Sequence, residues 1–289
     1  MSFANEYTRQ ALISCINRTA VIFTQWPFER VVEQLSKVEE RGLILDNIKF
    51  FSCAEPRKFS FMDETNRSLI CFLTNQQTSS HEGVALILLG DDSVNILNNI
   101  FLHDGSTSHP SIYISQNQEA TAQVEDMMFS SASREIPRET SKSCSNATLC
   151  VIKPHAVQKG NVGSILQLIL NEGFGINKIG SFTLDIISAT EFYEAYTGII
   201  DHYNIVLNEF ASGSCVAIEI VSRSGAQGSI VESFRNFCGP YDFSIAKELF
   251  PESLRARFGQ SNVQNAVHCT DLVENATTEV DFFFDILMK

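Results

Sequence analysis

The sequence predicts an α+β fold made of two ferredoxin-like (split βαβ) domains in tandem, and three observations support this. The chain has 289 residues, enough for roughly two domains of about 100–200 residues each. A polar stretch over 131–146 lacks apolar periodicity, as is typical of a linker. On either side of it, strand-like and helix-like runs alternate in the same order. We therefore expect an N-terminal segment over 1–16, one domain over 17–130 and a second over 147–289.

The second part carries the clearer pattern, β-α-β-α-β-α-β. Its first helix presents one apolar face, formed by Val162, Ile165, Leu166, Ile169 and Leu170. Gly173 is placed to end that helix, while Ser188 and Glu191 fit a capping box that opens the next one. In chain order we predict a strand over 147–153, a helix over 161–174, a strand over 176–186, a helix from 188, a strand over 214–221, a helix over 231–237 and an apolar strand over 280–287.

The first part repeats this order in weaker form. The predicted elements are a strand over 19–25, a helix over 28–42, strands over 43–51 and 83–90, and an apolar run over 124–129 in the place of 280–287. Such self-similarity predicts an internal duplication.

Composition narrows the classes of function. A net charge of −13 argues against a general nucleic-acid binder, which needs clustered Lys and Arg for phosphate contacts. The eight cysteines form no CxxC pair and no zinc-type spacing, so we expect reduced thiols and an intracellular location. No signal-peptide pattern and no apolar run of bilayer length are present, so we expect no membrane association.

The segment NVQNAVHCTD, residues 262–271, contains the candidate catalytic histidine, His268. A lone histidine after an apolar pair is more often a packed or surface residue than a catalytic one. The residues around His268 therefore determine whether a catalytic role is indicated. Glu279 lies eleven residues further on and can accept a hydrogen bond from one ring nitrogen. That bond would fix the tautomer and leave the other nitrogen free to attack phosphorus. Thr270 is placed to bond the same carboxylate.

Basic and polar residues supply candidate phosphate contacts. Lys153 ends a predicted buried strand, and Arg235 and Arg255 offer the forked donors that suit a polyphosphate. Asn265 is a candidate ligand for a ribose hydroxyl or a phosphate.

Several of these segments together resemble the nucleoside diphosphate kinase family. TLCVIKPHAVQKGNVGSIL resembles the family's opening strand, Lys-Pro turn and first helix, and NVQNAVHCTD resembles its Asn-x-x-His-x-Ser/Thr-Asp active-site loop. With FCGP and SLRARFG in the family's order, the resemblance covers about 140 residues.

The resemblance implies a ping-pong transfer of the γ-phosphoryl group of a nucleoside triphosphate to His268 and then to a nucleoside diphosphate. Mg²⁺ would arrive on the nucleotide phosphates, with no metal ligands from the protein. The implied catalytic residues are His268, Glu279 and Lys153, and the implied nucleotide-binding residues are Lys153, Tyr196, Arg235, Arg255, Asn265 and Thr270.

The sequence departs from the family pattern in three places, and the first, weak base stacking, implies poor nucleotide affinity and slow turnover but not loss of phosphoryl transfer. The base-stacking Phe is replaced by Asn204, with Tyr203 beside it. The Gly-x-Thr phosphate contact becomes Gly239-Pro240-Tyr241. About three extra residues stand between FCGP and SLRARFG.

The first part lacks the family's chemistry. Thr24-Gln25 stand where the second part has Lys153-Pro154, and counting back from 124–129 places Tyr113 at the position of His268. We therefore predict a degenerate kinase domain retained for packing or partner binding, with the two halves forming an internal pseudo-dimer in place of the family's hexamers or tetramers.

Two functions remain compatible with the sequence. The first, implied by the resemblance, is a microtubule-associated protein of the axoneme whose second domain alone works as a nucleoside diphosphate kinase. Alternatively, the chain is a catalytically weak or inactive structural microtubule inner protein or nucleotide-binding scaffold. The resemblance is closest to a branch of the family associated with ciliary and flagellar doublet microtubules. It implies cytoplasmic, axonemal placement and tubulin or axonemal microtubule proteins as partners. Members of that branch usually carry a DM10 domain, which we do not expect here because the 1–16 segment is too short.

Overall fold

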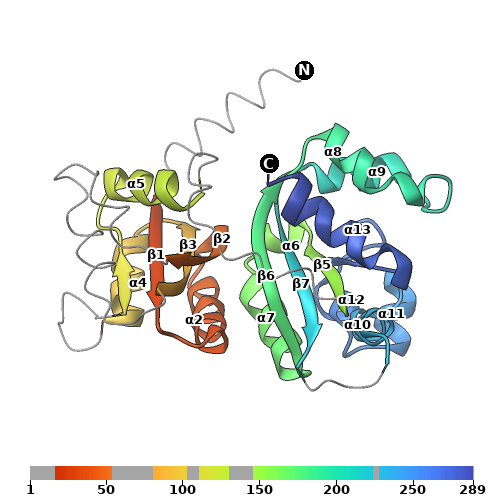
Figure 1. The fold of residues 1–289 in the computed structure, drawn as a ribbon, viewed down its shortest axis with the longest axis horizontal. Coiled ribbons are helices and arrows are strands. Elements are labelled where there is room, and N and C mark those ends of the chain that lie inside the picture. Colours follow the sequence, from red (N-terminus) through yellow and green to blue (C-terminus); the bar gives the residue numbers. More distant parts are fainter. Residues whose placement is uncertain (1–16, 54–80, 103–110, 130–145, 224–227, 289) are drawn as a thin grey trace.

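The computed structural model describes residues 17–53, 81–102, 111–129, 146–223 and 228–288 (Figure 1). The segment predicted over 1–16 and nearly all of the linker predicted over 131–146 lie outside these ranges. Every described helix is too short or too polar to cross a membrane.

The first half contains, in order, β1 (Arg18–Thr24), α2 (Phe28–Glu40), β2 (Ile44–Cys53), β3 (His81–Leu89), α4 (Ser93–Phe101), β4 (Ile112–Ile114) and α5 (Gln118–Phe129). The second half contains β5 (Ala147–Ile152), α6 (Pro154–Gln158), α7 (Val162–Asn171), β6 (Phe174–Thr183), α8 (Ile186–Phe192), α9 (Tyr203–Phe210), β7 (Ser214–Ser222), α10 (Ile230–Cys238), α11 (Phe243–Leu249), α12 (Leu254–Phe258), β8 (Val267–Cys269) and α13 (Ala276–Asp281), with 3₁₀ turns at Glu194–Tyr196 and Val273–Asn275 and a π-helical turn at Phe282–Ile286.

The strands form one eight-stranded sheet in the order β4-β1-β3-β2-β6-β7-β5-β8. Within each half the order is fourth, first, third, second, and neighbouring strands are antiparallel. This is the ferredoxin-like arrangement, so the predicted α+β class is confirmed. The order is also a palindrome about the β2–β6 pair, as two copies of one unit related by a pseudo-two-fold axis would give.

Helix α7 forms where the apolar face predicted it. All five apolar residues of that face are buried, because the helix lies on the sheet with that face inward. Gly173 follows the helix with a φ of 94°, a left-handed conformation that glycine adopts without a Cβ clash.

The final predicted strand over 280–287 is wrong. Residues 276–281 form helix α13 and residues 282–286 form a π-helical turn, so Glu279 lies on a helix. The fourth strand is instead β8, which contains His268. An apolar run of eight residues fits a buried strand and a buried helix equally well, so its periodicity could not decide between them. The matching run over 124–129 is also helical, within α5.

The predicted capping box is also wrong. Helix α8 begins at Ile186, and its N-cap is Asp185, whose carboxylate accepts the Ser188 N–H at 2.7 Å. The helix therefore begins before the predicted start at 188, and it ends at Phe192.

The two halves meet edge to edge and helix to helix. Strands β2 and β6 pair at Lys49 and Gly180, and helices α2 and α7 lie side by side next to that junction (Figure 1). A Cβ on Gly163 of α7 would lie 2.5 Å from the backbone nitrogen of Ser36 on α2, so this close approach requires glycine. One core cluster of buried side chains runs through both helices.

Glu39, on α2, binds the start of α7 across this junction. Its carboxylate accepts the N–H groups of Val162 at 3.2 Å and Gly163 at 2.7 Å, two donors that have no partner within their own helix. Burial raises the pKa of Glu39 to about 7, although both N–H bonds oppose the rise.

This pKa gives a stability prediction. An unfolded Glu39 loses its proton near 4.5 and the folded one near 7, so its contribution is complete below pH 4.5 and is lost as pH rises through 7. The Glu39→Gln variant does not titrate there. We expect wild-type stability, measured by urea unfolding against this variant, to fall by up to about 3 kcal/mol between pH 4.5 and 7.5. If the free energies of unfolding of wild type and Glu39→Gln change in parallel with pH, this prediction is wrong.

Candidate active site

The pairing of β8 with β5 sets the position of His268. The histidine lies opposite Val151, and the pairing continues on both sides through backbone bonds. The Thr270 N–H donates to the Leu149 carbonyl at 3.2 Å, and the Lys153 N–H donates to the Ala266 carbonyl at 2.9 Å. The histidine is therefore held on a buried strand rather than on a free loop.

Helix α13 brings Glu279 to His268, and two further residues bond the same carboxylate. His268 Nε2 lies 2.9 Å from Glu279 Oε2, which also accepts the Thr270 hydroxyl at 2.9 Å. The Tyr196 hydroxyl donates to Oε1 at 3.2 Å. The structure thus brings together four of the predicted site residues.

The charge on Glu279 assigns the tautomer of His268. Burial raises the pKa of the carboxyl, but the adjacent His268 and the bonds from His268, Thr270 and Tyr196 outweigh burial and leave the pKa below its usual value. An ionised carboxylate only accepts hydrogen bonds, so the proton lies on Nε2. Nδ1 then keeps its lone pair, as a nucleophile requires.

Aromatic rings cover one side of the histidine. The ring centroids of Phe192, Tyr193 and Tyr196 lie 5.0, 5.7 and 5.9 Å from that of His268, all edge to face. The apolar rings limit the approach of water to the imidazole, and only 5% of His268 is exposed.

Arg255 is held rigidly beside the strand. Its guanidinium donates to the carbonyls of Val267 at 3.3 Å and Gly239 at 2.8 Å and to the sulfur of Cys269 at 3.6 Å. A guanidinium has five N–H donors, so two remain for a phosphate. Gly239 has a φ of 84°, and a Cβ there would lie 2.4 Å from Ser253 Oγ. The backbone position that accepts the Arg255 bond therefore requires glycine.

Lys153 is a buried cation at the end of β5. Only 1% of it is exposed, and its ammonium donates to the Val263 carbonyl at 3.1 Å. Burial lowers its pKa to about 8, with Arg255 acting in the same direction and the Glu209 carboxylate opposing both. A bound polyphosphate would restore the full charge, because an anion favours the protonated amine.

Asn265 and Tyr241 carry buried polar atoms that fit a ligand. Within the described part of the chain, neither the amide oxygen nor the amide nitrogen of Asn265 has a hydrogen-bond partner, and the Tyr241 hydroxyl also lacks one. A buried polar side chain without hydrogen-bond partners costs about 1–3 kcal/mol, and a phosphate or sugar hydroxyl would satisfy these groups. The residues present therefore suit a phosphorylated ligand.

Two residues that the sequence predicts to bind the nucleotide have other partners in the protein. Arg235 is 54% exposed and pairs with Asp271 at 3.0 Å, so it reaches the site only at its rim. Thr270 is fully buried; besides its bond to Glu279, its hydroxyl accepts the Leu149 N–H at 3.2 Å. Its hydroxyl is therefore committed to the protein and supports Glu279 instead of facing a nucleotide.

The departures from the family pattern also have structural counterparts. The Tyr203 hydroxyl donates to the Tyr193 carbonyl at 3.2 Å, which ties it to helix packing, while Asn204 is exposed. The extra residues after FCGP coincide with helix α11, which Asp242 caps through the Ile245 N–H at 2.9 Å.

The first half repeats the backbone frame of the site without its chemistry. In β1 and β4, Tyr113 lies opposite Ile22, as His268 lies opposite Val151. The Thr24 N–H donates to the Ser111 carbonyl at 3.0 Å, in the manner of Lys153. Tyr113 and Thr24 therefore occupy the positions that His268 and Lys153 hold in the second half.

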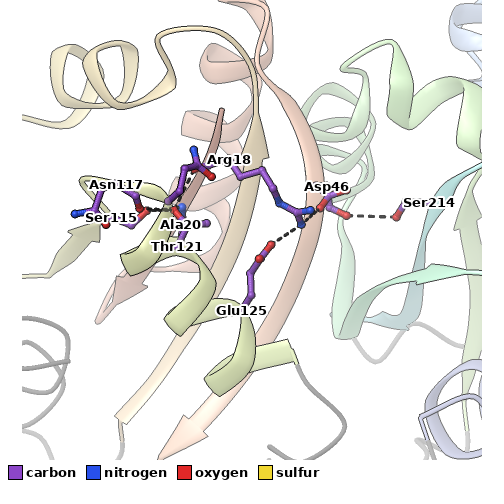
Figure 2. A network of polar contacts seen from close by, with 9 residues as sticks. Arg18, Ala20, Asp46, Ser115, Asn117, Thr121, Glu125 and Ser214 are labelled. Atoms are coloured by element: carbon purple, nitrogen blue, oxygen red, sulfur yellow. Dashed lines mark hydrogen bonds and ion pairs between the residues drawn. The ribbon is translucent and has the colours of Figure 1, made fainter. Parts of the chain in front are cut away.

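Figure 2 shows what replaces the His-Glu contact in the first half. The Ala20 N–H donates to Ser115 Oγ at 2.8 Å, as Leu149 does to Thr270, but Ser115 pairs with the Thr121 hydroxyl at 2.7 Å and not with a carboxylate. The nearby Glu125 instead forms an ion pair with Arg18, which also bonds Asp46. These contacts fasten α5 to the sheet.

Sequence reasoning missed the pair His155 and Glu209, whose side chains meet at 2.6 Å beside Lys153. The two residues are 54 positions apart, so no local spacing reveals them. Among the described residues, no group of three or more His, Cys, Asp or Glu side chains is arranged to hold a metal ion.

Comparison with known proteins identifies relatives over both halves. The family model described as nucleoside diphosphate kinase matches residues 146–287. Nucleoside diphosphate kinase homolog 7 of Mus musculus is 33% identical over 311 residues, covering 99% of this chain and 76% of that protein. The nucleoside diphosphate kinase of Aquifex aeolicus is 33% identical over 137 residues, 47% of this chain and 92% of that protein. An orthorhombic crystal structure of the Aquifex aeolicus kinase matches with 31% identity and a TM-score of 0.44 over 48% of this chain and 95% of the other.

The unpaired amide of Asn265 gives a prediction with opposite effects on stability and binding. Asn265→Leu removes two buried unpaired polar atoms, so the ligand-free protein should gain about 1–3 kcal/mol of stability. The same change should weaken binding of ADP with Mg²⁺. Thermal unfolding with and without the nucleotide measures both effects; a destabilised variant that binds ADP normally would contradict the assignment.

Proposed function

Because the chain belongs to the nucleoside diphosphate kinase family, we propose that its second half transfers the γ-phosphoryl group of a nucleoside triphosphate to a nucleoside diphosphate through His268. The observation that carries this proposal is the 2.9 Å contact between His268 Nε2 and Glu279. It leaves Nδ1 deprotonated and fixes the ring's direction, which a phosphorus-attacking imidazole needs.

Two balanced steps complete the reaction. In the first, Nδ1 attacks the γ-phosphorus; a P–N bond forms, the bond to the β–γ bridging oxygen breaks, and a nucleoside diphosphate leaves. In the second, a terminal oxygen of another nucleoside diphosphate attacks the phosphohistidine, and the P–N bond breaks. Glu279 stays ionised throughout and stabilises the positive charge that the ring acquires.

Positioning and charge neutralisation supply most of the rate in phosphoryl transfer. Lys153 and Arg255 would neutralise phosphate oxygens from buried positions, with Arg235 at the rim. Asn265 would bind a ribose hydroxyl or a phosphate oxygen. Mg²⁺ would enter with the nucleotide and neutralise part of the charge on its phosphates, with no ligand supplied by the protein. Each charged contact is worth roughly 2–4 kcal/mol in the transition state. The exposed Asn204 offers little stacking for the base, so we expect slow turnover.

The first half would serve as the fixed partner of the second. It shares the sheet and a core with the second half. Tyr113 and Thr24 supply neither an imidazole nor a phosphate-binding cation at the positions of His268 and Lys153. A single chain would then provide the paired arrangement that other family members build from separate subunits.

A structural role on microtubules is the second candidate. Similarity to homolog 7 extends over 99% of the chain. A first half that lacks the histidine and the lysine fits a structural role in an assembly better than a role in bulk metabolism. We propose cytoplasmic, axonemal placement in a cilium or flagellum, with tubulin or axonemal microtubule proteins as partners. Pelleting with purified doublet microtubules tests this, and protein that stays in the supernatant at low salt would exclude it.

The kinase proposal predicts a phosphorylated histidine. Incubation with γ-labelled ATP and Mg²⁺ should give an acid-labile, alkali-stable label that added GDP discharges as GTP. His268→Ala should remain unlabelled, because the variant lacks the imidazole nitrogen that attacks the γ-phosphorus. A folded wild type that does not label would reject the kinase and leave the structural role.

A further inference from the structure

A buried histidine–carboxylate pair lies next to the site and takes no part in the proposed transfer. His155, on α6, and Glu209, on α9, approach to 2.6 Å between Nδ1 and Oε1, and both side chains are 6% exposed. The His155 backbone N–H also points to Oε1, at 3.4 Å. Burying such a pair costs solvation free energy, so its position calls for an explanation.

The other ring nitrogen of His155 reaches the active-site loop. His155 Nε2 lies 3.2 Å from the Ala266 N–H, which donates to it. Ala266 stands between the two functional residues Asn265 and His268. The pair therefore connects helix α9 to the backbone of that loop.

The backbone at Ala266 is strained. Its φ is 68°, in the left-handed region where a Cβ is unfavourable. The Val267 N–H donates to the Asn265 carbonyl at 2.9 Å, which closes a three-residue γ-turn around Ala266, a form that is rare with positive φ. Strain of this kind costs of order 1–3 kcal/mol and persists only where surrounding contacts enforce it.

The direction of the hydrogen bonds shows what enforces it. An ionised Glu209 accepts the proton on Nδ1, which leaves a lone pair on Nε2 for the Ala266 N–H. Only this tautomer makes both bonds. Glu209 also favours the charged form of Lys153, whose backbone N–H bonds the Ala266 carbonyl at 2.9 Å. The Ala266 N–H is thus held by His155 of the pair, and the Ala266 carbonyl by Lys153 next to it.

We propose that His155 and Glu209 are positioning residues, which hold the Ala266 turn so that Asn265 and His268 face the nucleotide together. This inference rests on the proposed phosphoryl transfer. Its structural part, the contact from His155 to the turn, stands apart from activity and can be measured in the ligand-free protein.

The test compares substitutions at one position. His155→Leu removes both hydrogen bonds, whereas His155→Gln keeps one donor for Glu209 and one acceptor for Ala266. Leu97→Ala, a core truncation on α4 of the other half, controls for loss of stability alone. His155→Asn, too short to bridge both partners, replaces the leucine variant if that protein does not fold.

Two quantities are measured for each folded protein: the single-turnover rate of labelling from γ-labelled ATP, and hydrogen exchange of the Ala266 amide by NMR. We expect labelling by His155→Leu to be roughly 10- to 100-fold slower, the scale of a small misplacement of reacting groups, with Ala266 exchanging faster and ADP affinity changing less than the rate. His155→Gln should recover most of the rate, and Leu97→Ala should label like wild type.

Each alternative outcome overturns a different statement. If His155→Leu labels as fast as wild type, the pair does not position the site and the proposed kinase activity stands. If the glutamine variant is as slow as the leucine variant, the bridging bonds are not the cause. If wild type does not label, the kinase proposal fails, and unchanged Ala266 exchange in His155→Leu would remove the contact as well.

Discussion

The candidate site depends on one short backbone interaction, the pairing of β8 with β5. Three residues of β8 place His268 opposite Val151, and the same register brings Thr270 to Leu149 and Ala266 to Lys153. Glu279 then needs only the turn into α13 to reach the imidazole. A slip of one residue would turn His268 to the other face of the sheet, because side chains alternate along a strand. Directly before the strand, the backbone of Ala266 is strained, with a φ of 68°.

The same interaction occurs in the first half and explains how one domain keeps the fold without the chemistry. β4 pairs with β1 in the equivalent register, with Tyr113 opposite Ile22. Ser115 keeps the backbone contact that Thr270 makes. The frame survives because it is made of backbone bonds and buried apolar side chains, while the histidine and the lysine are side chains that the frame does not need. The continuous sheet and the Glu39 contact with α7 make the first half part of the second half's structure.

Patterns that repeat locally were readable from the sequence. The apolar face of 162–171, the duplicated order and the alignment of Tyr113 with His268 all follow from spacing along the chain. The apolar run over 280–287 predicts a strand but forms helical turns, because length and hydrophobicity alone do not separate a buried strand from a buried helix. His155 and Glu209 were missed because 54 residues separate them and only the packing of α6 against α9 joins them. The unpaired amide of Asn265 likewise depends on burial, which appears only in three dimensions.

Native mass spectrometry after incubation with ATP and Mg²⁺ at alkaline pH tests whether one chain holds two kinase frames but only one reactive site. It counts chains per particle and phosphoryl groups per chain in the same spectrum. We expect particles of a single chain that carry at most one phosphoryl group, and we expect this group to disappear when GDP is added. Two phosphoryl groups on a chain would show that the first half also reacts, and a folded protein that never gains one would contradict the assignment of His268.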